Sequence, residues 1–318
     1  MNKTIIALLL ILLSVNTYAH SGPDIPTPLD LDSLAAAFGW DFDSTEITTQ
    51  KITDDLYVLF GAGGNIAVSV GEDGVLIVDD QFPQLMPKIR KAIGEIGGKE
   101  INFAITTHWH FDHAEGNLVL GPAGTWLVAH ENSREMMKND HVINLVVAAY
   151  EQKAYPESAW PDITFSNEMQ FHQNGQTIDL LHFGPAHTTG DTAVIFRGSN
   201  AVHLGDVFNR SGYPFIDAGN GGSIDGIIRF CAETLKQISK DTTVIPGHGP
   251  VGNYQTLVDY IDMLTIIRAR MIKLIDAGAT LEDVIAAKPT AEFDAVQGDN
   301  VGFINRAYMS LTHKVVDR

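Results

Sequence analysis

Apolar and β-branched residues occur along the chain in two blocks of short runs, and each block is followed by a helical pattern. In the first block the glycine-rich connectors GAGG and GEDG separate the runs, as is typical of hairpins. The runs that we predict to be strands are ITDDLYVLF (52–60), NIAVSV (65–70), VLIVDD (75–80), INFAITT (101–107) and TWLVAH (125–130). A helix is predicted over about 83–96, and residues 131–152 are predicted to be mostly helical.

The second block repeats this layout. Its predicted strands lie within residues 163–175, 176–184, 191–198, 200–206 and 242–247. Ser223 is suited to cap a helix over about 224–239. Two strand-rich blocks, each with helices, predict an αββα sandwich of the α/β class, in which two mixed β-sheets pack face to face with helices on both outer faces.

The two ends of the chain have different patterns. Residues 20–45 are rich in proline and aspartate and are predicted to form an irregular arm. Residues 253–318 are predicted to be helical: apolar side chains recur at helical spacing over 253–276, Thr280 and Asp283 form a capping-box pattern, and a last helix covers about 299–315. No linker composition interrupts residues 20–318, so we predict a single domain.

The first residues, MNKTIIALLLILLSVNTYAH, have the layout of a secretory signal peptide. Lys3 is followed by an apolar run from Ile5 to Leu13 and by small residues near Ala19. This run is too short for the roughly 20 residues that a transmembrane helix needs. We therefore predict that residues 1–19 are removed and that the protein is exported, to the periplasm or the medium, without a membrane anchor.

Charge and cysteine content narrow the partners. The formal charge is −18, and residues 1–19 hold one lysine and no acidic residue, so export would leave the chain still more acidic. An acidic surface repels phosphate backbones, so we expect a small-molecule substrate and no nucleic acid. The oligomeric state stays open. Cys231 is the only cysteine, which excludes an intramolecular disulfide, and its helical context favours a buried core position.

The stretch THWHFDH holds three histidines and an aspartate at the end of a predicted strand. His108 and His110 are two positions apart and point the same way if the extended conformation continues, and Asp112 and His113 lie on the turn that follows. Imidazole and carboxylate groups are zinc ligands. Four donors are too many for one tetrahedral ion that keeps an open position, so the turn predicts two metals.

Three further donors stand where predicted strands become loops. His187 lies in HTTGD, Asp206 closes AVHLGD, and His248 stands between two glycines in PGHGP. Loops at the rim of a sheet commonly carry catalytic groups. A lone histidine at such a place is usually structural, but the combination of these donors with HWHFDH predicts one metal site.

These motifs, in this order, resemble the metallo-β-lactamase superfamily over roughly residues 50–250, and GVLIVDD resembles the strand of that family that ends in an aspartate, here Asp79. The resemblance implies the αββα sandwich with the site at one edge between the sheets. It implies one metal held by His108, His110 and His187, and a second held by Asp112, His113 and His248. Asp206 would bridge the two metals, and Asp79 would orient the ligands from behind.

The resemblance also implies a reaction. Two Zn²⁺ ions, with iron or manganese as alternatives, would hold a bridging hydroxide that attacks a carbonyl, and Asp112 would orient this hydroxide while it binds a metal. The best-known lactamases of the superfamily have a cysteine ligand where this chain has Asp206. An aspartate bridge is typical of its glyoxalase II and lactonase branches. An ester, thioester, lactone or cyclic amide is therefore expected as substrate, with weak β-lactamase activity as a side reaction.

Substrate contacts are expected from the loop that follows Asp206, where Arg210, Tyr213 and Asn220 are candidates, although these residues would serve equally well to shape the loop. The alternative function is a mononuclear-iron sulfur dioxygenase of the same fold, which uses only part of the ligand set. A non-catalytic binding protein of this fold is the third reading, and the filled ligand positions argue against it. A nuclease fits the ligands, but the acidic charge argues against it.

Overall fold

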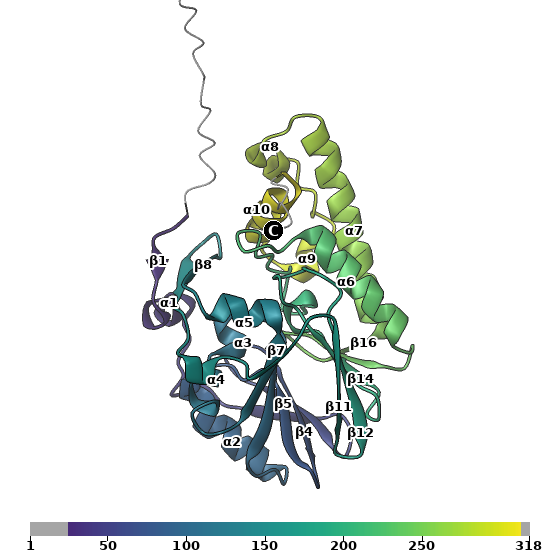
Figure 1. The fold of residues 1–318 in the computed structure, drawn as a ribbon. Coiled ribbons are helices and arrows are strands. Elements are labelled where there is room, and N and C mark those ends of the chain that lie inside the picture. Colours follow the sequence, from purple (N-terminus) through teal and green to yellow (C-terminus); the bar gives the residue numbers. More distant parts are fainter. Residues whose placement is uncertain (1–24, 313–318) are drawn as a thin grey trace, which may run out of the picture.

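The structure is a computed structural model that describes residues 25–312 (Figure 1). The predicted signal peptide, residues 1–19, lies outside the described residues. Within the described part, no helix combines the length and the apolar composition that crossing a membrane requires.

The first large sheet contains seven strands in the order β10-β7-β6-β5-β4-β3-β2. Neighbours from β2 to β5 pair antiparallel through hairpins, whereas β5, β6, β7 and β10 pair in parallel. The strands are β2 (Thr48–Lys51), β3 (Leu56–Phe60), β4 (Ile66–Gly71), β5 (Gly74–Val78), β6 (Ile101–Thr106), β7 (Trp126–His130) and β10 (Ile163–Phe165). The sheet is therefore mixed, as predicted.

The second large sheet contains six strands in the order β11-β12-β13-β14-β15-β16. All neighbours pair antiparallel except β14 and β15, which are parallel because α6 connects them. The strands are β11 (Glu168–Gln173), β12 (Gln176–Leu181), β13 (Ala193–Phe196), β14 (Ala201–His203), β15 (Thr243–Ile245) and β16 (Gly252–Asn253).

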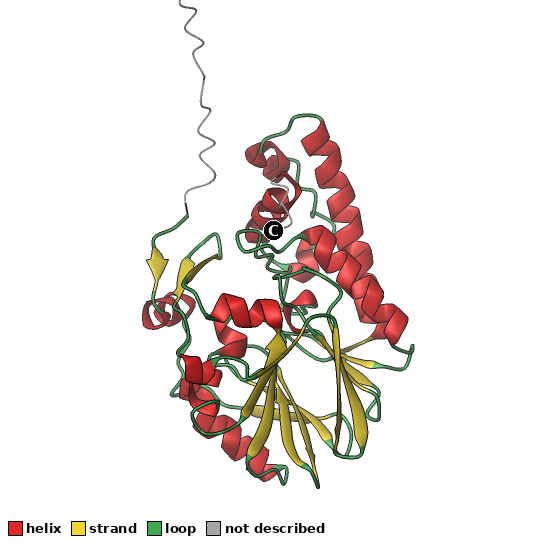
Figure 2. Cartoon of the chain, viewed as in Figure 1, coloured by secondary structure: helices red, strands yellow, loops and turns green. Residues whose placement is uncertain are grey.

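The two sheets meet along a shared apolar core. Val58, Val78 and Ile105 of the first sheet join Ile178 and Phe196 of the second in one buried cluster. On the outer side of the first sheet, α2 (Met86–Glu95) follows the 3₁₀ turn η1 (Pro83–Leu85), and on the outer side of the second lie α6 (Ile224–Gln237) and α7 (Tyr254–Asp276) (Figure 2). The predicted αββα sandwich is confirmed.

The remaining helices are short and lie mainly at the edge where the strands end. They are α1 (Leu31–Phe38), α3 (Phe111–Ala114), α4 (Asn117–Leu120), α5 (Glu131–Met137), α8 (Leu281–Ala286), α9 (Asp294–Gln297) and α10 (Val301–Thr312), with the 3₁₀ turns η2 (Glu157–Ala159) and η3 (Gly205–Val207). Two caps match the predicted signals: Ser223 caps α6, and a capping box of Thr280 and Asp283 begins α8. A further capping box, at Asn253, begins α7.

Two predicted segments differ from the structure. The helix predicted over 131–152 ends at Met137, and the rest forms β8 (His141–Asn144) and β9 (Ala149–Gln152). The irregular arm predicted over 20–45 contains β1 (Pro28–Leu29) and α1, which Asp30 caps at its start and Gly39, with φ 71°, at its end. β9 pairs with β1, about 120 residues earlier, a long-range contact that no local pattern reveals. The ends of α1, in contrast, are marked locally by Asp30 and Gly39, and this helix was overlooked.

Candidate metal centre

The predicted donors meet at one edge of the sandwich, the upper edge of the sheets in Figure 1. β6 ends at Thr106, and the segment that follows carries four donors into the short helix α3. His187 lies in the loop between β12 and β13, Asp206 lies in η3 after β14, and His248 follows β15. Each donor therefore stands just beyond the end of a strand, so the rigid sheets fix its position.

The donors form three overlapping groups whose ligand atoms lie within 4.8 Å of one another. The groups are His108, His110 and His187; His108, His113 and Asp206; and Asp112, His113 and His248. His108, His110, His113 and His187 are buried, while the other three donors are partly exposed. All seven residues singled out from the sequence are thus brought together, in groups that could hold metal ions.

The donor atoms face each other in a way that suits cations. His110 Nδ1 lies 2.9 Å from His187 Nε2, and His113 Nε2 lies 3.2 Å from His248 Nε2. His108 Nε2 is buried and has no hydrogen-bond partner among the described residues. A buried polar atom without a partner is costly. Divalent cations between these nitrogens would satisfy them, so the residues present fit the metals that the motifs imply.

The charges around the site also suit cations. Burial alone would lower the pKa of His113, but the carboxylates of Asp206, Asp112 and Asp79 raise it well above the usual range. For His248, burial is likewise outweighed by Asp206 and Asp112, which raise its pKa to about 10. Two imidazoles that attract protons so strongly lie in a field of negative charge, and a metal ion would occupy the same field.

Asp79 lies behind the donors, where the sequence placed it. Its carboxylate accepts hydrogen bonds from Thr107 N at 2.7 Å and Thr107 Oγ1 at 2.8 Å, and its Oδ2 lies 2.7 Å from His113 Nδ1. Thr107 Oγ1 in turn lies 3.1 Å from His108 Nδ1. With Nδ1 engaged in this way, both imidazoles present Nε2 to the centre, which is the orienting effect of a carboxylate behind a histidine ligand.

Asp217 supports the centre and was missed in the sequence. Its Oδ2 lies 2.9 Å from His110 Nε2, so His110 presents Nδ1 to the centre instead. Asn220 donates hydrogen bonds to both carboxylate oxygens of Asp217, at 3.0 and 2.9 Å. The Phe215 carbonyl oxygen lies 2.9 Å from His187 Nδ1. The segment FIDAGN carries no periodic pattern, and only its position after Asp206 drew attention to it.

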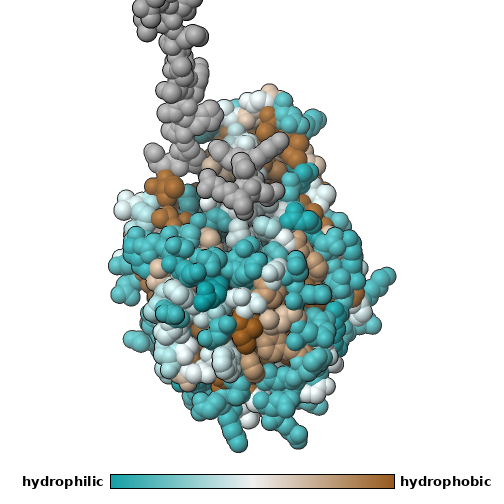
Figure 3. All heavy atoms as spheres, viewed as in Figure 1, coloured by the Kyte–Doolittle hydropathy of each residue, from teal (hydrophilic) through white to brown (hydrophobic). Residues whose placement is uncertain are grey.

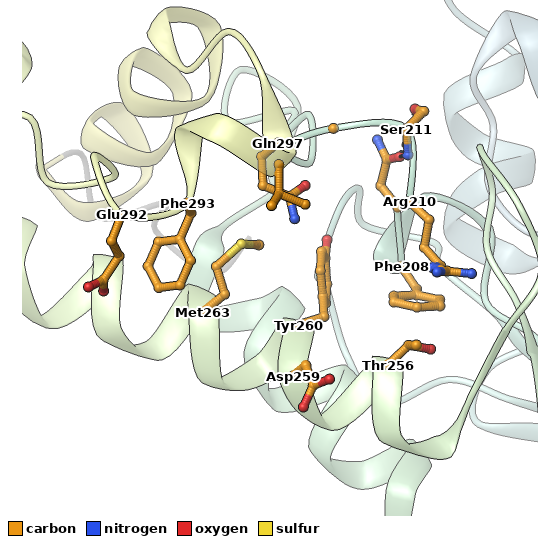
Figure 4. A pocket seen from close by; sticks show the side chains of 13 residues that line it. Phe208, Arg210, Ser211, Thr256, Asp259, Tyr260, Met263, Glu292, Phe293 and Gln297 are labelled. Carbon is orange, nitrogen blue, oxygen red and sulfur yellow. Dashed lines mark hydrogen bonds between the residues drawn. The ribbon is translucent and has the colours of Figure 1, made fainter.

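The three predicted substrate-contact residues occupy different places. Tyr213 lines the pocket above the donors, but its hydroxyl donates to Asp294 Oδ1 at 2.8 Å. Asn220 is engaged with Asp217. Arg210 lines a neighbouring cavity of about 550 Å³, drawn in Figure 4, and its guanidinium donates to the carbonyl oxygens of Pro250 at 2.9 Å and Val251 at 2.6 Å. Tyr213 alone of the three lines the donor pocket.

Two packed sheets with a cluster of histidines and carboxylates at their common edge define an α/β sandwich with a candidate metal centre. The sequence profile of the metallo-beta-lactamase superfamily matches residues 60–279, and the chain belongs to this superfamily. Members of the superfamily are mostly metal-dependent hydrolases. The recognition of the family from the motifs is thereby confirmed.

Relatives resemble the chain at low identity. It is 22% identical over 192 residues to the 2,4-dinitroanisole O-demethylase subunit alpha of Nocardioides sp. (strain JS1661), covering 59% of this chain but only 54% of that subunit. It is 22% identical over 202 residues to a probable metallo-hydrolase of Methanocaldococcus jannaschii, covering 61% of this chain and 91% of that protein.

Solved structures share the fold. A metallo-beta-lactamase from Pontibacter korlensis matches with a TM-score of 0.56 and 15% identity, covering 69% of this chain and 99% of that one. The DIM-1 metallo-beta-lactamase matches with a TM-score of 0.56 and 19% identity, covering 69% of this chain and 97% of that one. At such identities the likeness concerns the fold.

Proposed function

We propose that the protein is a dinuclear metal-dependent hydrolase that acts on a carbonyl compound, either an ester, a thioester, a lactone or a cyclic amide. The observation that carries this proposal is that two of the three donor groups share no residue. His108, His110 and His187 would hold one ion, and Asp112, His113 and His248 would hold the other. Zinc is the ion that this mixture of imidazole and carboxylate donors suits, with iron or manganese as alternatives.

Asp206 supports the proposal of two ions because its carboxylate lies between the sets. Oδ1 is 3.1 Å from His113 Nε2 and 3.4 Å from His248 Nε2, on the side of the second set. Oδ2 is 3.8 Å from His187 Nε2, on the side of the first set. A carboxylate with one oxygen toward each set has the arrangement of a bridging ligand.

Divalent cations at these sets would supply a water of lowered pKa as nucleophile and a Lewis acid for the carbonyl oxygen. The chain's own groups would position the reactants. Asp112 is only partly buried, lines the pocket above the donors, and has its Oδ2 3.1 Å from His248 Nε2. In this place it can accept a hydrogen bond from the attacking water and hold it against the substrate.

The test combines elemental analysis with a hydrolysis panel. The panel contains a simple aryl ester, a γ-lactone, an acyl-glutathione thioester and a cephalosporin, on which weak activity is expected. Because one relative is named for O-demethylation of 2,4-dinitroanisole, an aryl methyl ether is added. Two divalent ions per chain with hydrolysis of a carbonyl substrate is the expected result. One iron per chain with oxygen uptake would instead establish the dioxygenase alternative and overturn the proposal.

Asp206→Ala provides the matched variant. We expect it to lose at least one metal ion per chain and to lower turnover by about a hundredfold, since bridging and orientation are both removed. Asp262→Ala is the control, because Asp262 lies exposed on α7. Unchanged metal content and rate in Asp206→Ala would exclude Asp206 from the site.

We also propose that the protein is exported, on the layout of residues 1–19 alone. Cell fractionation followed by N-terminal sequencing tests this directly. A periplasmic or secreted protein that begins at His20 is expected. A protein that stays in the cytoplasm with residue 1 or 2 at its start would contradict export.

A further inference from the structure

The pocket above the donors has walls that are mostly apolar. It encloses about 460 Å³, and the donors Asp112, Asp206 and His248 lie along it. Its apolar lining comes from several segments that are distant in sequence: Phe38, Trp40, Phe111, Leu145, Phe215 and Phe303 are the main contributors. A substrate that reaches the donors must therefore pass between apolar and aromatic side chains.

Part of this wall lies outside the stretch that matches the superfamily, residues 60–279. Phe38 and Trp40 belong to α1 and the residues after it, and Phe303 belongs to α10. Segments beyond the shared fold thus contribute to the shape of the pocket. This chain's substrate preference can therefore differ from that of its relatives.

Ring packing holds the wall in place. The Phe215 ring lies 6.0 Å from the His110 ring and 5.7 Å from the His187 ring, so it borders the donors directly. The Tyr213 and Phe303 rings stack at 5.0 Å with an angle of 7° between their planes. The Trp40 ring lies 6.2 Å from the Phe111 ring. These contacts fix apolar surface around the donors before any substrate binds.

The charged side chains that line the pocket also restrict the substrate. The lining includes no lysine or arginine among the described residues, and its acidic members are Asp112, Asp206 and Asp299. The Arg210 guanidinium does not line this pocket, because it donates to the carbonyl oxygens of Pro250 and Val251. An anionic group on the part of a substrate that lies away from the donors would find no cation. It would lie against apolar side chains or near Asp299.

We propose that this site takes uncharged carbonyl substrates with a large apolar arm, aryl or acyl, and discriminates against substrates that carry an anionic group on that arm. This inference rests on the proposed hydrolase function and defines its substrate class. The carbonyl would lie at the donors, and the arm would lie between Phe215 on one side and the Trp40 and Phe303 segments on the other.

A series of nitrophenyl esters tests the proposal. From acetate through butyrate and hexanoate to octanoate, kcat/KM is expected to rise by about fourfold per methylene until the pocket is filled. The nitrophenyl monoester of suberic acid has the length of octanoate and a terminal carboxylate, and its kcat/KM is expected to be lower than that of octanoate by about tenfold or more. A carboxylated ester that reacts as well as octanoate would overturn the inference.

Variants connect the preference to the wall. Trp40→Ala is expected to reduce the gain per methylene to less than about twofold while the metal content stays unchanged. Trp126→Ala is the matched control, because Trp126 is 55% exposed on β7 and does not line the pocket. An unaltered chain-length dependence in Trp40→Ala would remove this wall from substrate binding.

Gly302 allows the reverse test. It lines the pocket, and a Cβ atom added there meets no atom within 4 Å. Gly302→Arg places a cation beside the arm, and the suberate monoester is expected to gain about two- to fivefold relative to octanoate. No relative gain in a folded, metal-loaded variant would count against the charge argument.

Binding separates this inference from the proposed function. Nitrophenyl alkyl ketones of the same lengths keep the carbonyl but cannot be hydrolysed, and calorimetry measures their affinity without turnover. Affinity that grows with chain length and falls with a terminal carboxylate supports the inference, even if the protein hydrolyses none of the esters. A lack of hydrolysis would contradict only the hydrolase proposal. Affinity that is independent of length contradicts the inference even if nitrophenyl acetate is hydrolysed.

Discussion

The Oδ2 atom of Asp79 lies 2.7 Å from Nδ1 of His113, and both side chains are fully buried. Asp79 adopts φ 65°, a left-handed conformation that is uncommon outside glycine and that turns its carboxylate back toward the segment after β6. Asp79 thereby fixes which nitrogen His113 presents to the candidate metal centre.

Asp79→Asn tests this orienting role. An amide is a weaker acceptor than a carboxylate, so His113 would be held less firmly and would be less basic. We expect metal affinity to fall by about 10- to 100-fold with the fold intact. Competition with a chelator gives the affinity and circular dichroism the fold. Asp54→Asn, at an exposed carboxylate, serves as control. Equal affinities in the two variants would show that Asp79 does not orient a ligand.

Asp217→Ala tests the support behind His110. Removal of the carboxylate frees His110 Nε2 and leaves the ring able to rotate. We therefore expect the metal affinity of the His108, His110 and His187 set to fall by about 10- to 100-fold. Asn220→Ala removes the amide that donates to Asp217 and to the Val142 carbonyl oxygen but leaves the carboxylate behind His110 in place, so it should have a smaller effect. The order of the two effects, measured by chelator competition, is the result to check, and a larger effect of Asn220→Ala would refute this arrangement.

Gly64→Ala tests how closely the backbone approaches the centre. A methyl group at this position would overlap the His113 imidazole, whereas at Gly94, in the last turn of α2, it meets no atom within 4 Å. Gly64→Ala is expected to displace His113 and to abolish full metal loading. Gly94→Ala should load normally and gain up to about 1 kcal/mol of stability from helix propensity. Elemental analysis and thermal unfolding distinguish the two, and full metal loading of Gly64→Ala would disprove the close contact.

His130 makes stability depend on pH away from the donors. Its Nδ1 accepts a hydrogen bond from Asn132 N at 3.1 Å and so caps α5, while its Nε2 lies 2.7 Å from the Ser166 carbonyl oxygen. The cap requires the neutral imidazole. Burial and the neighbouring His182 lower the pKa of His130 below its ordinary value near 6.5.

The sign follows from this lowered pKa. Below about pH 6.5 the unfolded chain binds a proton that the folded chain does not, so this contribution to stability is present at neutral pH and is lost as the pH falls toward the folded-state pKa. His130→Asn keeps an acceptor for the helix cap and cannot titrate. Chemical unfolding of both proteins should show wild type losing about 1 kcal/mol relative to the variant on acidification. A constant difference between them from pH 7.5 to 5 would refute the role of His130.

The sequence predicted the sandwich and its donors because both depend on local patterns. His108, His110, Asp112 and His113 share one turn, and His187, Asp206 and His248 each stand where an apolar run ends beside glycine or proline. Asp217 and the Phe215 carbonyl were missed because their roles depend on how an aperiodic loop folds back onto His110 and His187. Arg210 was expected near the substrate because its loop follows Asp206, but its guanidinium instead donates to two carbonyl oxygens near β16.

The wall of the pocket shows the same limit. The β8–β9 pair was missed because β9 joins β1 across most of the first half of the chain, and α1 was overlooked within a segment that was predicted to be irregular. The face drawn in Figure 3 is largely hydrophilic, with apolar atoms in scattered groups.

Each donor set combines residues from both halves of the chain. His108 and His110 come from beside the first sheet and His187 from beside the second, and His248 of the second half completes the set of Asp112 and His113. Neither half can assemble a set by itself, so a bound ion would clamp the two sheets together. Metal supply would then govern how long the protein survives as well as whether it reacts, because an ion that binds only the joined halves disfavours their separation.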